Sequence, residues 1–211
     1  MWWGIAGLAA TYLLVRRKRE PREFALPYPT ARVYGTFGDC RSGGRQHKGL
    51  DLGGVGPDHG LGTPVRALTF CEVTDIVRPE DNSARWGRRD TRSGTVTRRG
   101  VTLPRAKQIP GYGLVRFHTL DHGSAHTGTM ITTVGTAGPL EGHRIRYMHL
   151  ADPLPSLRVG SLLAPGDELG LMGGTAIMES LPHVHIDIES PAGDRVDVAS
   201  FVGLAPDLSR C

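Results

Sequence analysis

The chain has 211 residues, 39% of them hydrophobic, with a formal net charge of +4 and a pI near 9.2. This length supports one good hydrophobic core, and a single domain remains once the first ~30 residues are set aside. No internal repeat is present, which excludes a solenoid or a propeller. The mild basic excess suits work near an anionic surface without establishing it.

The N-terminus combines a largely apolar segment, residues 2–15, with a basic flank, residues 16–19. As a helix the apolar segment would be roughly 21 Å long, short of the ~30 Å hydrocarbon core, but its aromatic and basic ends would let it span a thinned bilayer. A cleaved signal peptide fits less well, because the basic residues of a signal peptide precede its apolar stretch, whereas here they follow it. We expect a hydrophobic helix and membrane anchor in residues 1–19, and a stiff proline-containing linker in residues 20–33.

His47 and Asp51 begin the next informative stretch, which is rich in glycine. On a straight strand the two side chains would face the same way but lie roughly 13 Å apart, too far to share a metal ion with bonds of about 2 Å. A helical turn would bring them together, but Gly49 between them and the Gly53-Gly54 pair after them disfavour a helix. We expect a turn that opens into a strand.

Three more histidines occur in two later segments. His149 lies near the end of a short segment of β character, residues 146–150, and alone it is most simply structural. His183 and His185 stand in an alternating apolar run, so a strand would turn both imidazoles to one face and the intervening apolar side chains to the other. Alone, this pair fits surface histidines as well as a functional site.

The ordered set His-x-x-x-Asp, Tyr-x-His-Leu and His-x-His resembles the zinc endopeptidases of the lysostaphin and LytM type, the M23 peptidase family. The glycine-containing segments at 62–67, 111–113, 121–123, 165–170 and 173–175 also resemble that family, and the similarity runs from about residue 34 to about residue 198. Short β-like runs and the lack of helical periodicity independently predict mostly β structure. The resemblance implies a single-domain antiparallel β-sheet with a groove, the duplicated hybrid motif type, in residues 34–203, followed by a tail at 204–211.

The resemblance also implies the roles of five residues. His47, Asp51 and His185 would hold Zn²⁺, leaving a fourth position for water, as catalytic zinc sites do. His149 and His183 would orient or deprotonate that water and stabilise the developing charge. No His-Glu-x-x-His sequence is present, so the base function falls to histidine.

Three segments depart from the family pattern: 78–109, 124–142 and 176–182. We expect the first two to project from the β core as extended hairpins or loops, and the third to lengthen the loop beside the groove. The first is basic, with Arg78, Arg85, Arg88, Arg89, Arg92, Arg98, Arg99, Arg105 and Lys107. It fits a solvated loop or an attraction to an anionic wall polymer or lipid; nucleic acid is disfavoured because Trp86 is its only aromatic residue.

The three cysteines, Cys40, Cys71 and Cys211, form no Cys-x-x-Cys zinc motif. Cys40 and Cys71 could form a disulfide in an exported domain, and unpaired thiols fit equally well. We expect the terminal Cys211 to be free. A Cys40-His47 nucleophilic site is a competing interpretation, but it leaves the other histidines and Asp51 unexplained.

The resemblance implies an endopeptidase that hydrolyses peptide bonds in bacterial peptidoglycan. The alternatives are a non-catalytic wall-binding or hydrolase-activating module on the same fold, and a structural virion or envelope component with a basic docking loop. We expect the domain to be anchored by the N-terminus and to face the cell wall, although residues 16–19 would place it on the cytoplasmic side by charge. A component of a phage virion, carrying a lytic enzyme, would resolve that conflict.

Overall fold

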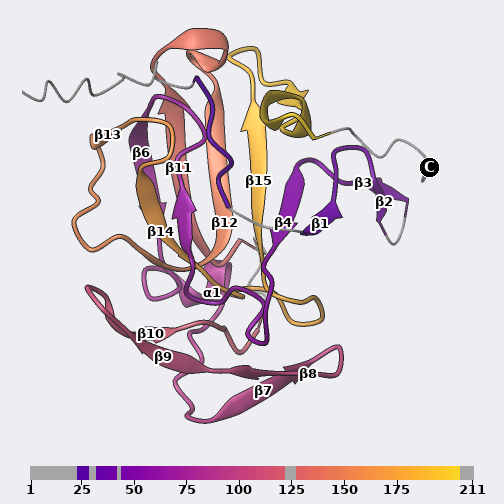
Figure 1. Cartoon of the computed structure of the whole chain (residues 1–211), viewed down its shortest axis with the longest axis vertical. Coiled ribbons are helices and arrows are strands. Elements are labelled where there is room, and N and C mark those ends of the chain that lie inside the picture. The colour runs from indigo at the N-terminus through magenta and orange to yellow at the C-terminus, as the bar shows by residue number, and fades with distance from the viewer. Residues whose placement is uncertain (1–22, 29–31, 42–43, 122–126, 205–211) are drawn as a thin grey trace, which may run out of the picture.

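The protein is described by a computed structural model that covers residues 23–28, 32–41, 44–121 and 127–204 (Figure 1). The expected N-terminal helix and anchor at 1–19, and Cys211, lie outside the described residues. Among the residues that are described, no helix has the length and apolar character needed to cross a membrane. Mainly β structure, predicted from the sequence, is confirmed.

One ten-stranded sheet forms the body of the molecule (Figure 1). Its main path runs β1 (Arg32–Gly35), β4 (Leu50–Gly53), β15 (His183–Glu189), β12 (Arg144–Pro153), β11 (Thr129–Gly135), β6 (Cys71–Val77) and β13 (Leu162–Leu163). Off this path, β14 (Glu168–Met172) pairs with β12 and with β5 (Pro64–Arg66), and β16 (Arg195–Val196) pairs with β15. The paired strands run antiparallel, so neighbouring segments meet through a ladder of backbone hydrogen bonds.

The alternation of apolar residues places the core on one face of this sheet. In β15, Val184, Ile186 and Ile188 are fully buried in the main core, where Leu50 and Leu52 of β4 also lie. Their neighbours in the sequence point to the opposite face, because side chains alternate along a strand. The apolar side of β4 and β15 therefore fixes the face on which His183, His185 and Asp51 stand.

The segment at 78–109 builds a smaller layer at one end of the molecule (Figure 1). It contains α1 (Ser83–Trp86), the antiparallel pair β7 (Thr95–Arg98) and β8 (Val101–Pro104), and β9 (Ala106–Ile109). β9 pairs antiparallel with β10 (Gly113–Arg116), which follows the segment in the chain. Leu103, Val115 and Phe117 form one buried cluster with Ala151 of β12 and Leu171 of β14, so this layer is packed against the main sheet. The remaining short elements are β2 (Cys40–Arg41), β3 (Arg45–Gln46) and two 3-10 helices, Gly138–Leu140 and Ala199–Val202.

The expectation that residues 124–142 project as an extended hairpin or loop is wrong for the central part of that segment. Residues 129–135 form β11, which lies between β12 and β6 in the main sheet. Its threonines suggested a polar loop, yet Thr129 and Thr133 are fully buried. Threonine is β-branched and fits a pleated strand when its hydroxyl is satisfied, as the Thr129 hydroxyl is by the carbonyl oxygen of Ala151 at 3.2 Å.

The cysteines exclude two of the interpretations left open by the sequence. Cys71 is free and buried in the core, where burial raises the pKa of its thiol to about 11. Because Cys71 is free, a disulfide between Cys40 and Cys71 is excluded. Cys40 is itself disulfide-bonded. The same observation excludes a free Cys40 thiolate beside His47, and with it the competing nucleophilic site.

Candidate metal site and groove

The pairing of β4 with β15 brings the candidate ligands together. His185 lies directly opposite Asp51 across this ladder, and His183 lies opposite Gly53. The chain bends at Gly49 before β4 begins, which confirms the expected turn opening into a strand. A Cβ at Gly49 would lie only 2.3 Å from the backbone oxygen of Ile186, so the bend that brings His47 to the site requires glycine.

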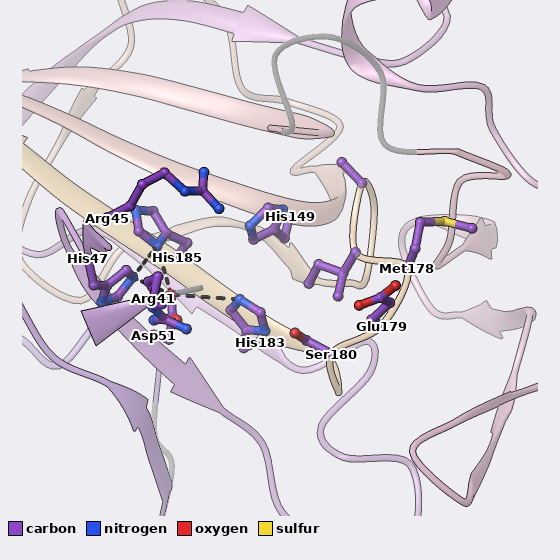
Figure 2. Close-up of a pocket in the computed structure, with 12 residues that line it drawn as sticks. Arg41, Arg45, His47, Asp51, His149, Met178, Glu179, Ser180, His183 and His185 are labelled. Atoms are coloured by element: carbon purple, nitrogen blue, oxygen red, sulfur yellow. Dashed lines mark hydrogen bonds and ion pairs between the residues drawn. The ribbon is translucent and has the colours of Figure 1, made fainter. Parts of the chain in front are cut away.

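The three predicted metal ligands converge on one point (Figure 2). Asp51 Oδ1 lies 2.7 Å from His185 Nδ1 and 3.2 Å from His47 Nε2, and the two nitrogens are 3.1 Å apart. Tetrahedral zinc with bonds of about 2.0 Å needs ligand atoms about 3.3 Å from one another. The observed separations are close to this value, so the donor set fits a zinc ion with only small shifts.

Neighbouring groups fix the orientation of two of these ligands. His47 Nδ1 donates a hydrogen bond to the backbone oxygen of Thr36 at 2.8 Å, which leaves Nε2 as the lone-pair nitrogen facing the other ligands. Arg41 Nη2 donates to Asp51 Oδ2 at 2.6 Å, which leaves Oδ1 facing the two histidines. Such outer contacts are typical of metal-ligating histidines and carboxylates.

His149 reaches the site through an irregularity in β12. Its φ of 65° lies in the left-handed region that non-glycine residues rarely adopt. Tyr147 and Leu150 both face the main core although they are three residues apart, so the strand alternation is interrupted between them. The Nδ1 of His149 donates to the backbone oxygen of Thr175 at 2.9 Å, which leaves Nε2 as the lone-pair nitrogen.

His183 lies beside both the metal ligands and His149 (Figure 2). Its Nδ1 donates to the backbone oxygen of Leu181 at 2.9 Å, and its Nε2 lies 3.7 Å from Asp51 Oδ1. The rings of His183 and His149 meet edge to face with centroids 5.1 Å apart. The structure thus brings together all five residues predicted from the sequence, three as a tight cluster and two beside it.

Comparisons with known proteins identify the fold. The solution structure of lysostaphin aligns with a TM-score of 0.51 at 17% identity over 87% of this chain and 55% of that one. The chain has the fold of the M23 peptidases. The catalytic domain of lysostaphin from Staphylococcus simulans (TM-score 0.47, 19% identity, 82% of this chain and 92% of that one) and LytU (TM-score 0.49, 20% identity, 87% and 92%) also align.

The structure has similar solved structures, whereas the sequence alone matched no family model or curated protein. At the identities above, the likeness concerns the M23 fold, and the chemistry of the site rests on its own residues.

The electrostatics of this M23-type site favour the protonation states that metal binding needs. Burial acts to raise the pKa of Asp51, but the attraction to His183 in its protonated form and the hydrogen bonds of His185 and His47 outweigh it and hold that pKa well below its ordinary value. Burial also lowers the pKa of His183, and lowers that of His149 well below its ordinary value. At neutral pH Asp51 is therefore a carboxylate and both imidazoles are neutral.

The five residues line a cavity of about 560 Å³. Figure 2 shows Met178, Glu179 and Ser180, from the loop at 176–182, across from His149 and His183. The expectation that this loop borders the groove is confirmed. Sequence reasoning missed Arg41 and Arg45, which also line the cavity; only their position shortly before His47 could have indicated them.

The cations of segment 78–109 are largely engaged within the fold. Five of them pair with carboxylates: Arg88 with Asp121, Arg89 with Glu80 and Asp152, Arg92 and Arg105 with Asp90, and Lys107 with Asp58. Arg98 and Arg99 donate to backbone oxygens of the groove loop. Attraction of this segment to an anionic polymer or lipid, one of the interpretations that the sequence left open, therefore finds no support.

Proposed function

We propose that the chain is a zinc-dependent endopeptidase that hydrolyses peptide bonds in bacterial peptidoglycan. The observation that carries this proposal is the convergence of His47, Asp51 and His185 at the floor of an open groove, with two further histidines beside them that are free of the ligand role. The described relatives support the reaction class, since lysostaphin is an antimicrobial peptidase.

The donor set suits zinc better than a hard oxygen-seeking cation. Two imidazoles and one carboxylate are borderline ligands, and three ligands on one side of a cavity leave a position open for water. When bound there, zinc would lower the pKa of its water and polarise a peptide carbonyl. The chain contributes the orientation of the ligands through Thr36 and Arg41.

His149 and His183 supply the proton chemistry in this proposal. Each is neutral and has its Nδ1 proton committed to a backbone oxygen, so its Nε2 lone pair can accept a proton from the attacking water. The imidazolium formed can then donate that proton to the leaving amine. Burial keeps both rings neutral before this transfer, and the edge-to-face contact of the two rings holds them beside the same reacting group.

A non-catalytic module on the same fold is the alternative. A module that only binds the wall has no need for a convergent ligand cluster or for two oriented imidazoles. All five residues are retained here and held by specific hydrogen bonds, which favours the enzyme. Anchoring by residues 1–19, with the domain facing the cell wall or carried in a phage virion, remains part of the proposal.

The direct test is digestion of purified walls of several chemotypes by the full chain in detergent, followed by mass spectrometry of the released peptides. We expect new peptide ends from at least one chemotype, and their loss on chelation with recovery on adding zinc. His143→Ala is a matched control because His143 lies outside the groove and its ring donates to the backbone oxygen of Glu141. Intact walls of every chemotype, treated with zinc-loaded protein, would contradict the proposal.

A further inference from the structure

The groove extends beyond the candidate metal site into a second hollow of about 610 Å³. The two cavities share Arg41, Arg45, His47 and His185, so a peptide bound across the metal ligands would enter both. Volumes of this size lie within the ordinary range for ligand pockets. The second hollow is therefore a candidate for the part of the substrate on the side of His47 away from the loop at 176–182.

This second hollow is strongly basic. Its lining includes five cationic side chains, Arg41, Arg45, Lys48, Arg146 and Arg195, and a single carboxylate, Asp187. Asp187 is shared by Arg146 at 2.7 Å and Arg195 at 2.9 Å, so one negative charge faces two positive ones. Glu189 adds further contacts to both arginines from outside the lining.

Arg45 and Lys48 carry the positive charges of this hollow that no carboxylate within the described ranges neutralises. Both are exposed, and within the described ranges neither forms an ion pair. They flank His47 in the sequence, and Figure 2 shows Arg45 extended over the groove near His185. At the other end of the groove the charged side chain of the loop is an acid, Glu179. The two ends of the groove therefore differ in charge, and the positive end lies beside His47.

We propose that this basic end binds a free carboxylate of the peptide substrate, with Arg45 as the main contact and Lys48 as the second. A guanidinium matches a carboxylate with two parallel hydrogen bonds, and a partly enclosed cavity strengthens such a contact. The proposal rests on the proposed peptidase function for the identity of the peptide. It adds that a peptide with a carboxylate beside the cleaved bond is preferred to its amide.

Calorimetric titration of the metal-free full chain tests the carboxylate contact without relying on turnover. The probes are two wall-type peptides that differ only in one glutamate carboxylate, present in one and converted to a primary amide in the other. We expect the acid to bind about tenfold more tightly than the amide, the effect of one charge-assisted hydrogen bond. Arg45→Gln should remove this preference, Lys48→Gln should reduce it about threefold, and Arg45→Lys should restore part of it.

Arg158→Gln is the matched control, because Arg158 is exposed, lies outside the groove, and its guanidinium donates to backbone oxygens of Pro155 and Leu157. Equal binding of acid and amide to the unchanged protein would overturn the inference, whether or not the walls are cut. The inference would also be overturned if a glycerol phosphate polymer bound more tightly than the acid peptide and if Arg45→Gln abolished that binding. If the protein does not cut walls but still binds the acid peptide more tightly than the amide, the proposed peptidase reaction is wrong and the carboxylate-binding site stands.

Discussion

The floor and the wall of the groove are held in different ways. The floor is a ladder of backbone hydrogen bonds, in which β15 carries His183 and His185 between β4 and β12. The wall is the loop at 176–182, which is attached by side chains: Arg98 donates to the oxygen of Met178 at 2.7 Å, and Arg99 donates to that of Glu179 at 3.0 Å. The candidate metal ligands therefore lie on rigid strands, whereas the loop that borders the same cavity is attached more loosely.

The largest effect should come from removing a ligand at the floor. His47→Ala or His185→Ala deletes one of three ligand nitrogen and oxygen atoms that lie within 4.8 Å of one another. We expect loss of bound zinc, measured by elemental mass spectrometry, and loss of wall lysis to the background level. Full lysis by either variant would show that the ligands have been assigned wrongly.

The next largest effect should separate proton chemistry from metal binding. His149→Ala and His183→Ala leave the three ligands in place but remove an Nε2 lone pair, so we expect zinc content to stay near that of the unchanged protein while turnover falls by about 10²-fold or more. Zinc content and initial rates should be measured on the same preparations. A His183 variant without zinc would move that residue into the ligand set.

The seam between floor and wall contains a buried histidine that should respond to pH. His118 bridges to Gly174, and its Nε2 donates to the oxygen of Pro104 at 3.2 Å. Burial lowers the pKa of His118 to about 4. The unfolded chain therefore takes up this proton at a higher pH than the folded protein does, so stability falls as pH drops from about 6.5 towards 4.

At pH 5 this single group should reduce the free energy of unfolding by about 2 kcal/mol relative to pH 7.5. Denaturant unfolding of the metal-free protein at the two pH values measures the effect. His118→Gln keeps a hydrogen-bonding side chain without a titrating group, so its loss of stability between the two pH values should be smaller by that amount. An identical pH dependence in the two proteins would remove His118 as the cause.

The smallest effect should come from loosening the wall. Arg98→Ala removes the hydrogen bond to Met178 but touches no metal ligand, so KM for a wall peptide should rise about threefold to tenfold while kcat changes little. Arg85→Ala in the same segment is the matched control, since Arg85 is exposed and packs over Trp86. A fall in kcat with KM unchanged would show that the loop acts on the chemistry rather than on binding.

The sequence predicted the floor well because its signals are local. The apolar alternation around His185 fixed the face of β15, and Gly49 with the His47-Asp51 spacing indicated a bend before a strand. His149 was named only through the order of the motifs. The left-handed φ of His149 accompanies a break in the strand alternation, because Tyr147 and Leu150 both face the core although they are three residues apart.

The wall could not be predicted because its contacts join distant residues. Arg98 and Met178 are 80 residues apart in the chain, so no local pattern links them. The excess of cations at 78–109 suggested an external partner, whereas its carboxylate partners lie partly outside the segment, at Asp58, Asp121 and Asp152. The segment that forms β11 was predicted as a loop for a different reason. Its threonines are polar, but they are also β-branched and therefore favour a strand.

The place of β15 in the sheet also decides when the candidate metal site can form. This strand comes near the end of the chain, yet it joins β4 to β12 in the middle of the sheet. Until it docks, the sheet is left as two parts with unpaired edges, and Asp51 has no partner from residue 185. A nascent or truncated chain that ends before β15 therefore has neither a continuous sheet nor the complete set of three candidate metal ligands.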